Sequence, residues 1–166
     1  KDNWTMIKNH FNLDFSVSEM VSKEQLMYLD YVESDDVKKF DDAYELMQRL
    51  YNNGYKIGIG TSSHKETATM LISKFGFDKY IKTLITCEDV AFSKPAPDIY
   101  LKVAKNLNSD SSDCVVIEDS YAGICSAKAA SMKCIAKRNI FNDNYNGADL
   151  IVLSSNELTD TAIEAL

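Results

Sequence analysis

Hydrophobic and polar positions follow two different rhythms along this 166-residue chain. From residue 2 to about residue 39 the apolar side chains recur at helical spacing, with Trp4, Ile7 and Phe11 on one face and a second apolar run over 17–32. No strand pattern precedes residue 40. The first part of the chain is therefore predicted to be two helices.

From residue 40 onward, short apolar runs alternate with amphipathic stretches. The pattern predicts strands at 55–60, 83–86, 114–117, 133–136 and 149–153, and helices at 42–53, 64–75, 97–107, 121–131 and 157–166. Three of the strands are nearly continuous apolar runs, which is typical of strands buried on both faces, namely 57–59, 115–117 and 150–153.

Alternation of strand and helix implies crossover connections and a parallel sheet. The expected fold class is therefore α/β, with a Rossmann-like parallel sheet covered by helices on both faces. Two parts are expected, a helical segment at 1–39 and an α/β core at 40–166.

Composition narrows the function without defining it. A net charge of −7 and the absence of a basic cluster argue against binding to nucleic acid. No apolar run reaches the roughly 18 residues that a membrane helix needs, so no membrane partner is expected. Cys87, Cys114, Cys125 and Cys134 are scattered, which favours reduced core thiols in a cytoplasmic protein over a metal site.

The first chemical motif, Thr61-Ser62-Ser63, lies between a predicted strand and the helix that follows it. Free backbone amides at a helix N-terminus attract anions, and the Thr61 hydroxyl is expected to face the same crevice. Ser63 precedes Glu66 by three residues, so we favour an N-cap role for it over substrate contact. Thr61 is balanced between a ligand contact and a structural role.

The second motif is a lysine whose backbone is stiffened by prolines. Lys94 precedes Pro95 and Pro97, and the second proline lies where a helix can start. Taken alone, Lys94 is interpreted as a solvated loop charge. Its place after a strand, with Asp98 four residues further on, favours a held cation.

The third motif is a pair of acids, Glu118 and Asp119, at the end of a buried-type strand. Adjacent carboxylates repel each other unless a cation or hydrogen bonds compensate. Either the pair binds a hard divalent cation, or one acid caps the next helix while the other is solvated.

These three motifs, in this order, closely resemble the haloacid dehalogenase superfamily, especially its β-phosphoglucomutase-like branch. The stretches that carry the resemblance are 56–63, 93–100 and 115–124. It implies a phosphatase or phosphomutase that acts on a small phosphorylated metabolite such as a sugar phosphate.

The resemblance also assigns roles to the motif residues. Thr61 contacts the transferring phosphoryl group, the amide of Ser62 assists, and Ser63 belongs to the same substrate-binding set. Lys94 neutralises the negative charge of the phosphoryl group and of the nucleophile. Glu118 and Asp119 hold Mg²⁺.

The family's first motif, a strand that ends in Asp-x-Asp, has no counterpart here, because Asp-x-Asp occurs nowhere in the sequence. The resemblance implies that this strand supplies the nucleophile and the acid–base group, and that it lies between the strands ending near Thr61 and Ile117. We expect the first motif and the opening half of a helical cap to lie outside this sequence, residues 1–39 being the rest of the cap. A Pro-Gly that commonly leads out of the cap is replaced by Phe40-Asp41.

Without that strand, three outcomes are open: the two inner strands close up, a missing N-terminal segment or another chain donates the centre, or the protein is longer. Two other functions also remain. A phosphoacceptor signalling domain uses similar residues, but places the acids first and the lysine last. A non-catalytic fragment that binds phosphate or a partner is the main alternative to an enzyme.

Overall fold

A computed structural model describes residues 2–34 and 36–166, which form two units, Lys1–Lys38 and Lys39–Leu166. Residues 1 and 35, which fall within the predicted helical segment, lie outside the described residues. No helix in the described part of the chain is both long enough and apolar enough to cross a membrane.

The first unit consists of two helices, α1 (Asp2–Phe11) and α2 (Val17–Glu33). The indole Nε1 of Trp4 donates to Glu24 at 2.6 Å, and the Trp4 ring meets the edge of Phe15. The predicted apolar face is only partly buried, because Phe11 is 64% exposed. Two helices alone give such a face little to pack against.

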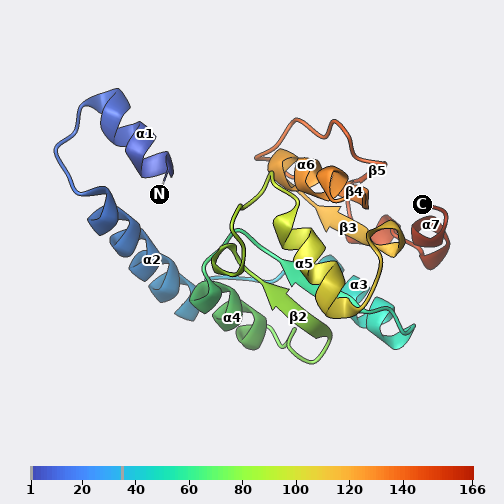
Figure 1. The fold of residues 1–166 in the computed structure, drawn as a ribbon. Coiled ribbons are helices and arrows are strands. Elements are labelled where there is room, and N and C mark those ends of the chain that lie inside the picture. Colours follow the sequence, from blue (N-terminus) through green and yellow to red (C-terminus); the bar gives the residue numbers. More distant parts are fainter. Residues whose placement is uncertain (1, 35) are drawn as a thin grey trace. The chain divides into compact units, whose positions relative to one another are not determined.

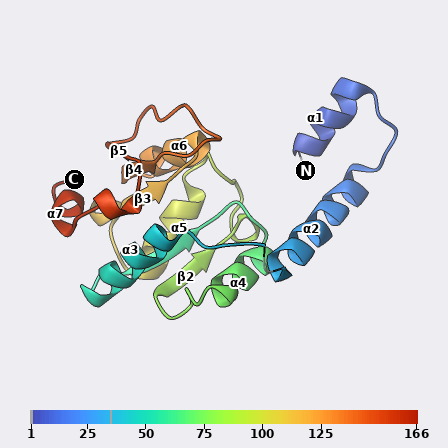
Figure 2. The same cartoon turned by 180° about the vertical axis from the view of Figure 1, so that it is seen from behind.

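The second unit alternates strands and helices as predicted (Figures 1 and 2). Its helices are α3 (Asp41–Asn52), α4 (Lys65–Lys74), α5 (Asp98–Leu107), α6 (Tyr121–Ala129) and α7 (Asp160–Glu164). Its strands are β1 (Ile57–Gly60), β2 (Ile81–Ile85), β3 (Val115–Glu118), β4 (Lys133–Lys137) and β5 (Leu150–Val152). The last helix is shorter than predicted, since residues Ser155–Glu157 form a separate 3₁₀ turn.

The pairings β1–β2, β3–β4 and β4–β5 are each parallel, and helices pack on both faces, which confirms the predicted class. On one face Ala104 of α5 and Ile124 of α6 pack against Val116 and Cys134. On the other, Leu46 of α3 and residues near the C-terminus pack against Ile135 and Val152.

The strands do not form one sheet, which corrects the expectation of a single sheet. β1 pairs with β2, β3 pairs with β4, and β4 pairs with β5, but no pairing joins β1 to β3 in the described residues. Between them lies a cavity of about 510 Å³, lined by both strands and by side chains of α3 and α5. The outcome in which these two strands close up is therefore wrong for this chain.

The open cavity also explains why some strands are less buried than predicted. β1 is half-buried along its whole length, and Ile117 in β3 is 39% exposed. Ile151 is 46% exposed because β5 is an edge strand. The most deeply buried strand in the described residues is β4, for which no such burial was predicted; it has a strand on each side, and Cys134, Ile135 and Ala136 are fully inaccessible.

Candidate active site

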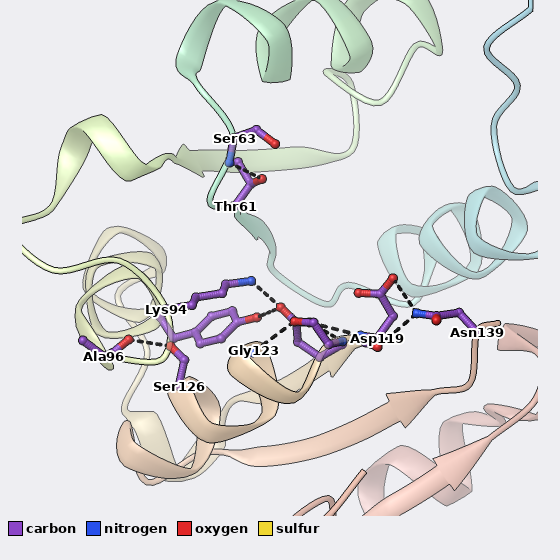
Figure 3. Close-up of polar contacts among 11 residues, drawn as sticks. Thr61, Ser63, Lys94, Ala96, Asp119, Gly123, Ser126 and Asn139 are labelled. Atoms are coloured by element: carbon purple, nitrogen blue, oxygen red, sulfur yellow. Dashed lines mark hydrogen bonds and ion pairs between the residues drawn. The ribbon is translucent and has the colours of Figure 1, made fainter. Parts of the chain in front are cut away.

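The predicted site residues other than Lys94 lie at or just beyond the carboxyl ends of strands, where ligands collect in open α/β sheets. Thr61 follows β1, Glu118 ends β3 and Asp119 follows it, while Lys94 lies in the loop before α5. The structure brings Lys94 and Glu118 into direct contact. Thr61 and Ser63 lie apart from them, on the β1 side (Figure 3).

The Thr61 turn is arranged so that its hydroxyl can still donate a hydrogen bond. The amide of Thr61 donates to the carbonyl of Ile85 at 2.9 Å, and the Thr61 Oγ1 accepts from the amide of Ser63 at 3.1 Å. Because Oγ1 acts as an acceptor in that contact, its proton remains available for an anion.

Ser63 is not the N-cap of the next helix, so that prediction is wrong. The cap position is His64, and the carboxylate of Glu88 accepts from the amide of Lys65 at 3.0 Å. Glu88 also contacts His64 Nδ1 at 3.0 Å. The amide of Lys65 and then His64 hold the pKa of Glu88 below its usual value. A side chain far along the sequence thus satisfies the helix end that Ser63 was expected to cap.

Lys94, Glu118 and Tyr100 form a buried polar cluster. The ammonium of Lys94 pairs with Glu118 Oε1, and the two side chains are only 10% and 8% exposed. The Tyr100 hydroxyl donates to the same oxygen at 2.5 Å, and Lys94 lies 4.7 Å from the Tyr100 ring centre. Lys94 is therefore a held cation, as the motif context predicted, and not a solvated loop charge.

The other carboxylate oxygen of Glu118 faces the start of α6. It accepts from the amide of Asp119 at 3.0 Å, the amide of Ser120 at 3.2 Å and the Ser120 hydroxyl at 3.0 Å. Burial opposes ionisation, but Lys94 and these donors outweigh it, so the pKa of Glu118 is lowered. For the Tyr100 hydroxyl, burial and then the neighbouring Glu118 carboxylate raise the pKa. Glu118 is thus a fully hydrogen-bonded carboxylate.

Asp119 is held differently, by neutral donors. The Asn139 side-chain amide donates to both the carbonyl oxygen and Oδ2 of Asp119, at 3.0 and 3.1 Å. No described residue donates to Asp119 Oδ1. Asn139 follows β4, so it too lies at the carboxyl end of a strand.

The acidic pair fits a hard divalent cation in kind, because both groups present carboxylate oxygens. The described residues contain no cluster of three or more metal-ligating side chains. Mg²⁺ commonly keeps several waters and is bound by one or two carboxylates plus phosphate oxygens, so two carboxylates suit it. Asp119 is exposed and can offer a carboxylate oxygen to a cation, whereas the Glu118 carboxylate is already paired with Lys94.

Sequence reasoning missed three residues that build this site: Tyr100, Ser126 and Asn139. Ser126 is buried in α6, and its hydroxyl donates to the carbonyl of Ala96 at 2.6 Å, which fixes the loop after Lys94. The polar Asn-rich stretch directly after a predicted strand was a signal that could have identified Asn139. Nothing local marks Tyr100 or Ser126.

Comparison with known proteins gives a consistent result. A family model described as haloacid dehalogenase-like hydrolase matches residues 6–137. A bifunctional riboflavin kinase/FMN phosphatase of Arabidopsis thaliana is 29% identical over 163 residues, covering 96% of this chain. This chain spans only 42% of that relative.

Solved structures show the same fold. A family IA, variant 3 hydrolase of the same superfamily from Entamoeba histolytica has a TM-score of 0.82 and 29% identity, over 97% of this chain and 76% of that one. A β-phosphoglucomutase from Clostridium difficile has a TM-score of 0.79 and 25% identity, over 96% and 72%.

Proposed function

Because the chain belongs to the haloacid dehalogenase-like hydrolases, we propose that it carries most of the site of a magnesium-dependent phosphoryl-transfer enzyme. The substrate we propose is a small phosphorylated metabolite, with sugar phosphates as the first candidates. A similar Arabidopsis protein is named an FMN phosphatase and a structural neighbour a β-phosphoglucomutase, which supports phosphomonoesters as the class.

The observation that carries this proposal is the buried cation beside the acidic pair. Lys94, in the loop before α5, is only 10% exposed, and its ammonium pairs with Glu118, the last residue of β3 and the neighbour of Asp119. A phosphate dianion and an attacking carboxylate repel each other, so a fixed ammonium at their meeting point favours the reaction. Thr61 is proposed to donate its hydroxyl proton to a phosphoryl oxygen, with the amide of Ser62 beside it.

Mg²⁺ bound by Asp119, with Glu118 as the second carboxylate, would neutralise negative charge on the phosphoryl oxygens. The Lys94 ammonium can then move from Glu118 toward the phosphate, because a metal cation near Glu118 would balance part of the negative charge of that carboxylate. Ser63 stays a candidate only through its exposed position beside Thr61.

The nucleophile must come from a group that this sequence lacks. We propose that an extended segment carrying an Asp-x-Asp occupies the cavity between β1 and β3, donated by an N-terminal segment or another chain. β1 and β3 both line this cavity and are not paired with each other, and the cavity walls are mainly apolar side chains. One Asp attacks phosphorus as the bond to the ester oxygen of the substrate breaks, and the other Asp protonates that leaving oxygen. The same second Asp then takes a proton from the water or hydroxyl that accepts the phosphoryl group from the aspartyl-phosphate.

The test supplies the segment in trans. The chain is mixed with a peptide of about five apolar residues followed by Asp-x-Asp, and phosphate release from a panel of sugar phosphates is measured with MgCl₂. A matched peptide carrying Asn-x-Asn is the control. Release that requires the Asp peptide, Mg²⁺ and Lys94, as judged by a Lys94→Met variant, is the expected result.

Peptide binding is followed separately through the thermal midpoint, which rises with ligand concentration. If the Asp peptide raises the midpoint and no substrate turns over, the catalytic proposal fails. A non-catalytic module that binds phosphate or a partner then becomes the better interpretation.

A further inference from the structure

The loop between β4 and β5 supplies hydrogen-bond donors to Asp119, although none of its residues belongs to the three motifs. We propose that Asn139 is a positioning residue for Asp119. Asn142 holds the main chain of Asp119, and Tyr145 holds both asparagines in place. This inference rests on the proposed function, because it assumes that Asp119 binds the divalent cation.

Two asparagine side chains hold the backbone and carboxylate of Asp119. Asn139 Nδ2 donates to the carbonyl and to Oδ2 of Asp119, at 3.0 and 3.1 Å (Figure 3). Asn142 Nδ2 donates to the same carbonyl at 3.0 Å. The main chain of Asp119 is therefore bound by two donors that come from 20 and 23 residues further along the chain.

Backbone amides of the same loop fix the orientation of the Asn139 and Asn142 side chains. Asn139 Oδ1 accepts from the amide of Phe141 at 2.7 Å, and Asn142 Oδ1 accepts from the amide of Asn144 at 3.2 Å. An asparagine that accepts with Oδ1 on one side must present its NH₂ group on the other. Each NH₂ group is thus directed at Asp119.

Tyr145 anchors this loop to the core. Its ring is 8% exposed and belongs to the cluster formed with α5, α6 and β4. Its hydroxyl accepts from the amide of Asn139 at 2.9 Å and donates to the carbonyl of Asn142 at 2.6 Å. A single buried phenol therefore sets the spacing of the two asparagines.

Neutral donors suit a cation ligand better than charged ones. The Lys94 ammonium pairs with Glu118, whereas the donor that Asn139 brings to Asp119 is a neutral amide, which adds no positive charge beside a cation. Asn139 engages Oδ2, and Asp119 is an exposed residue whose Oδ1 accepts from no described residue, so less rotational freedom is lost when a cation binds. Loss of such a supporting group typically weakens metal affinity about 10- to 100-fold.

The experiment measures Mn²⁺ affinity of the full chain by the EPR signal of free Mn²⁺, which needs no turnover. Asn139→Ala is expected to raise the Kd about 10- to 100-fold, and to broaden the signal of bound Mn²⁺ because the carboxylate can rotate. Tyr145→Phe should act in the same direction with a smaller change. Competition with Mg²⁺ shows that both ions use one site.

Asn144→Ala is the matched control. Asn144 Oδ1 accepts from the amide of Asn146 at 3.1 Å, so it makes the same kind of local turn without touching Asp119. It is expected to leave the Kd unchanged. Thermal unfolding of each variant without metal shows that the chain is folded at the temperature of the titration.

The outcomes separate the two proposals. If the unchanged chain binds no Mn²⁺, or Asp119→Asn binds as well as the unchanged chain, the proposed cation site is wrong and this inference fails with it. If Asp119→Asn abolishes binding while Asn139→Ala keeps the original Kd, the cation site stands and the positioning role of Asn139 is overturned. Equal losses in Asn139→Ala and Asn144→Ala also overturn it, since loop structure alone then explains the effect.

Discussion

At the scale of single residues, Gly123 shows how closely the site is packed. A Cβ at this position would lie 2.0 Å from the Glu118 carboxylate carbon, which is far inside contact distance. Glycine here lowers helix propensity, yet it lets the start of α6 approach the carboxylate. The glycine is therefore explained by the space that Glu118 occupies.

Gly123→Ala is expected to displace the Glu118 carboxylate and to lower the free energy of unfolding by about 1–3 kcal/mol, the usual cost of overpacking. Chemical denaturation measures the change. Ala122→Ser, at the exposed neighbouring position, should have little effect. An unchanged stability in Gly123→Ala would mean that Glu118 can move aside at no cost.

Tyr100 donates to one oxygen of the buried Glu118 carboxylate, Oε1, whose other partner is the Lys94 ammonium. Removing its hydroxyl in Tyr100→Phe leaves Glu118 Oε1 with Lys94 as its single described partner. A hydrogen bond to a charged group contributes about 1.5–3 kcal/mol, so a loss of that size in unfolding free energy is expected. The measurement is urea denaturation at pH 7, and a neutral result would show that water replaces the hydroxyl.

At the scale of elements, Asp42 joins the first core helix to the end of the chain. It pairs with Lys137 of β4 and accepts from the Ser154 hydroxyl at 3.0 Å and the Ser155 amide at 2.9 Å. The hydrogen bond from Lys137 is the largest cause that holds the pKa of Asp42 well below its usual range. One carboxylate thus fastens α3, β4 and the 3₁₀ turn before α7.

This arrangement predicts a pH-dependent contribution to stability. Because the pKa of Asp42 is lower when folded than when unfolded, its contribution is complete above about pH 4 and is lost as the pH falls below that value. Asp42→Asn should lower the unfolding free energy by about 1–3 kcal/mol at pH 7. The difference from the unchanged chain should shrink between pH 4 and pH 2. A difference that stays constant with pH would contradict this account.

At the scale of the whole second unit, the division of the strands into two sheets should govern local stability. β4 has partners on both sides, whereas β1 and β3 each border the cavity. Backbone groups that border a solvent-accessible cavity open more readily than those in a central strand.

Hydrogen exchange followed by mass spectrometry is expected to show the slowest exchange in 133–137 and faster exchange in 57–60 and 115–118. Addition of the Asp-x-Asp peptide should slow exchange in both of the latter segments and leave 150–152 unchanged, because β5 lies away from the cavity. Equal protection of β1 and β4 without peptide would show that the cavity is closed in solution.

Much of the fold followed from the pattern of the sequence. Apolar runs such as 115–117 and the glycine that follows 42–53 predicted each strand and helix of the core to within a few residues, because period and turn residues are local properties. The order of Thr61, Lys94 and the acidic pair likewise predicted a site at the strand ends. The short final helix was overestimated, since its 3₁₀ turn depends on Ser154 and Glu157 and on Asp42 far away.

The sequence by itself determined the alternation of strands and helices, the family and the residues that carry charge, because these depend on the order of residues along the chain. Only the tertiary structure decided which of them meet. It set Lys94 against Glu118, Glu88 at the start of α4 and Asn139 on Asp119, and it left a cavity between β1 and β3. Such contacts join residues 20 or more positions apart, and packing in three dimensions, not local spacing, brings them together.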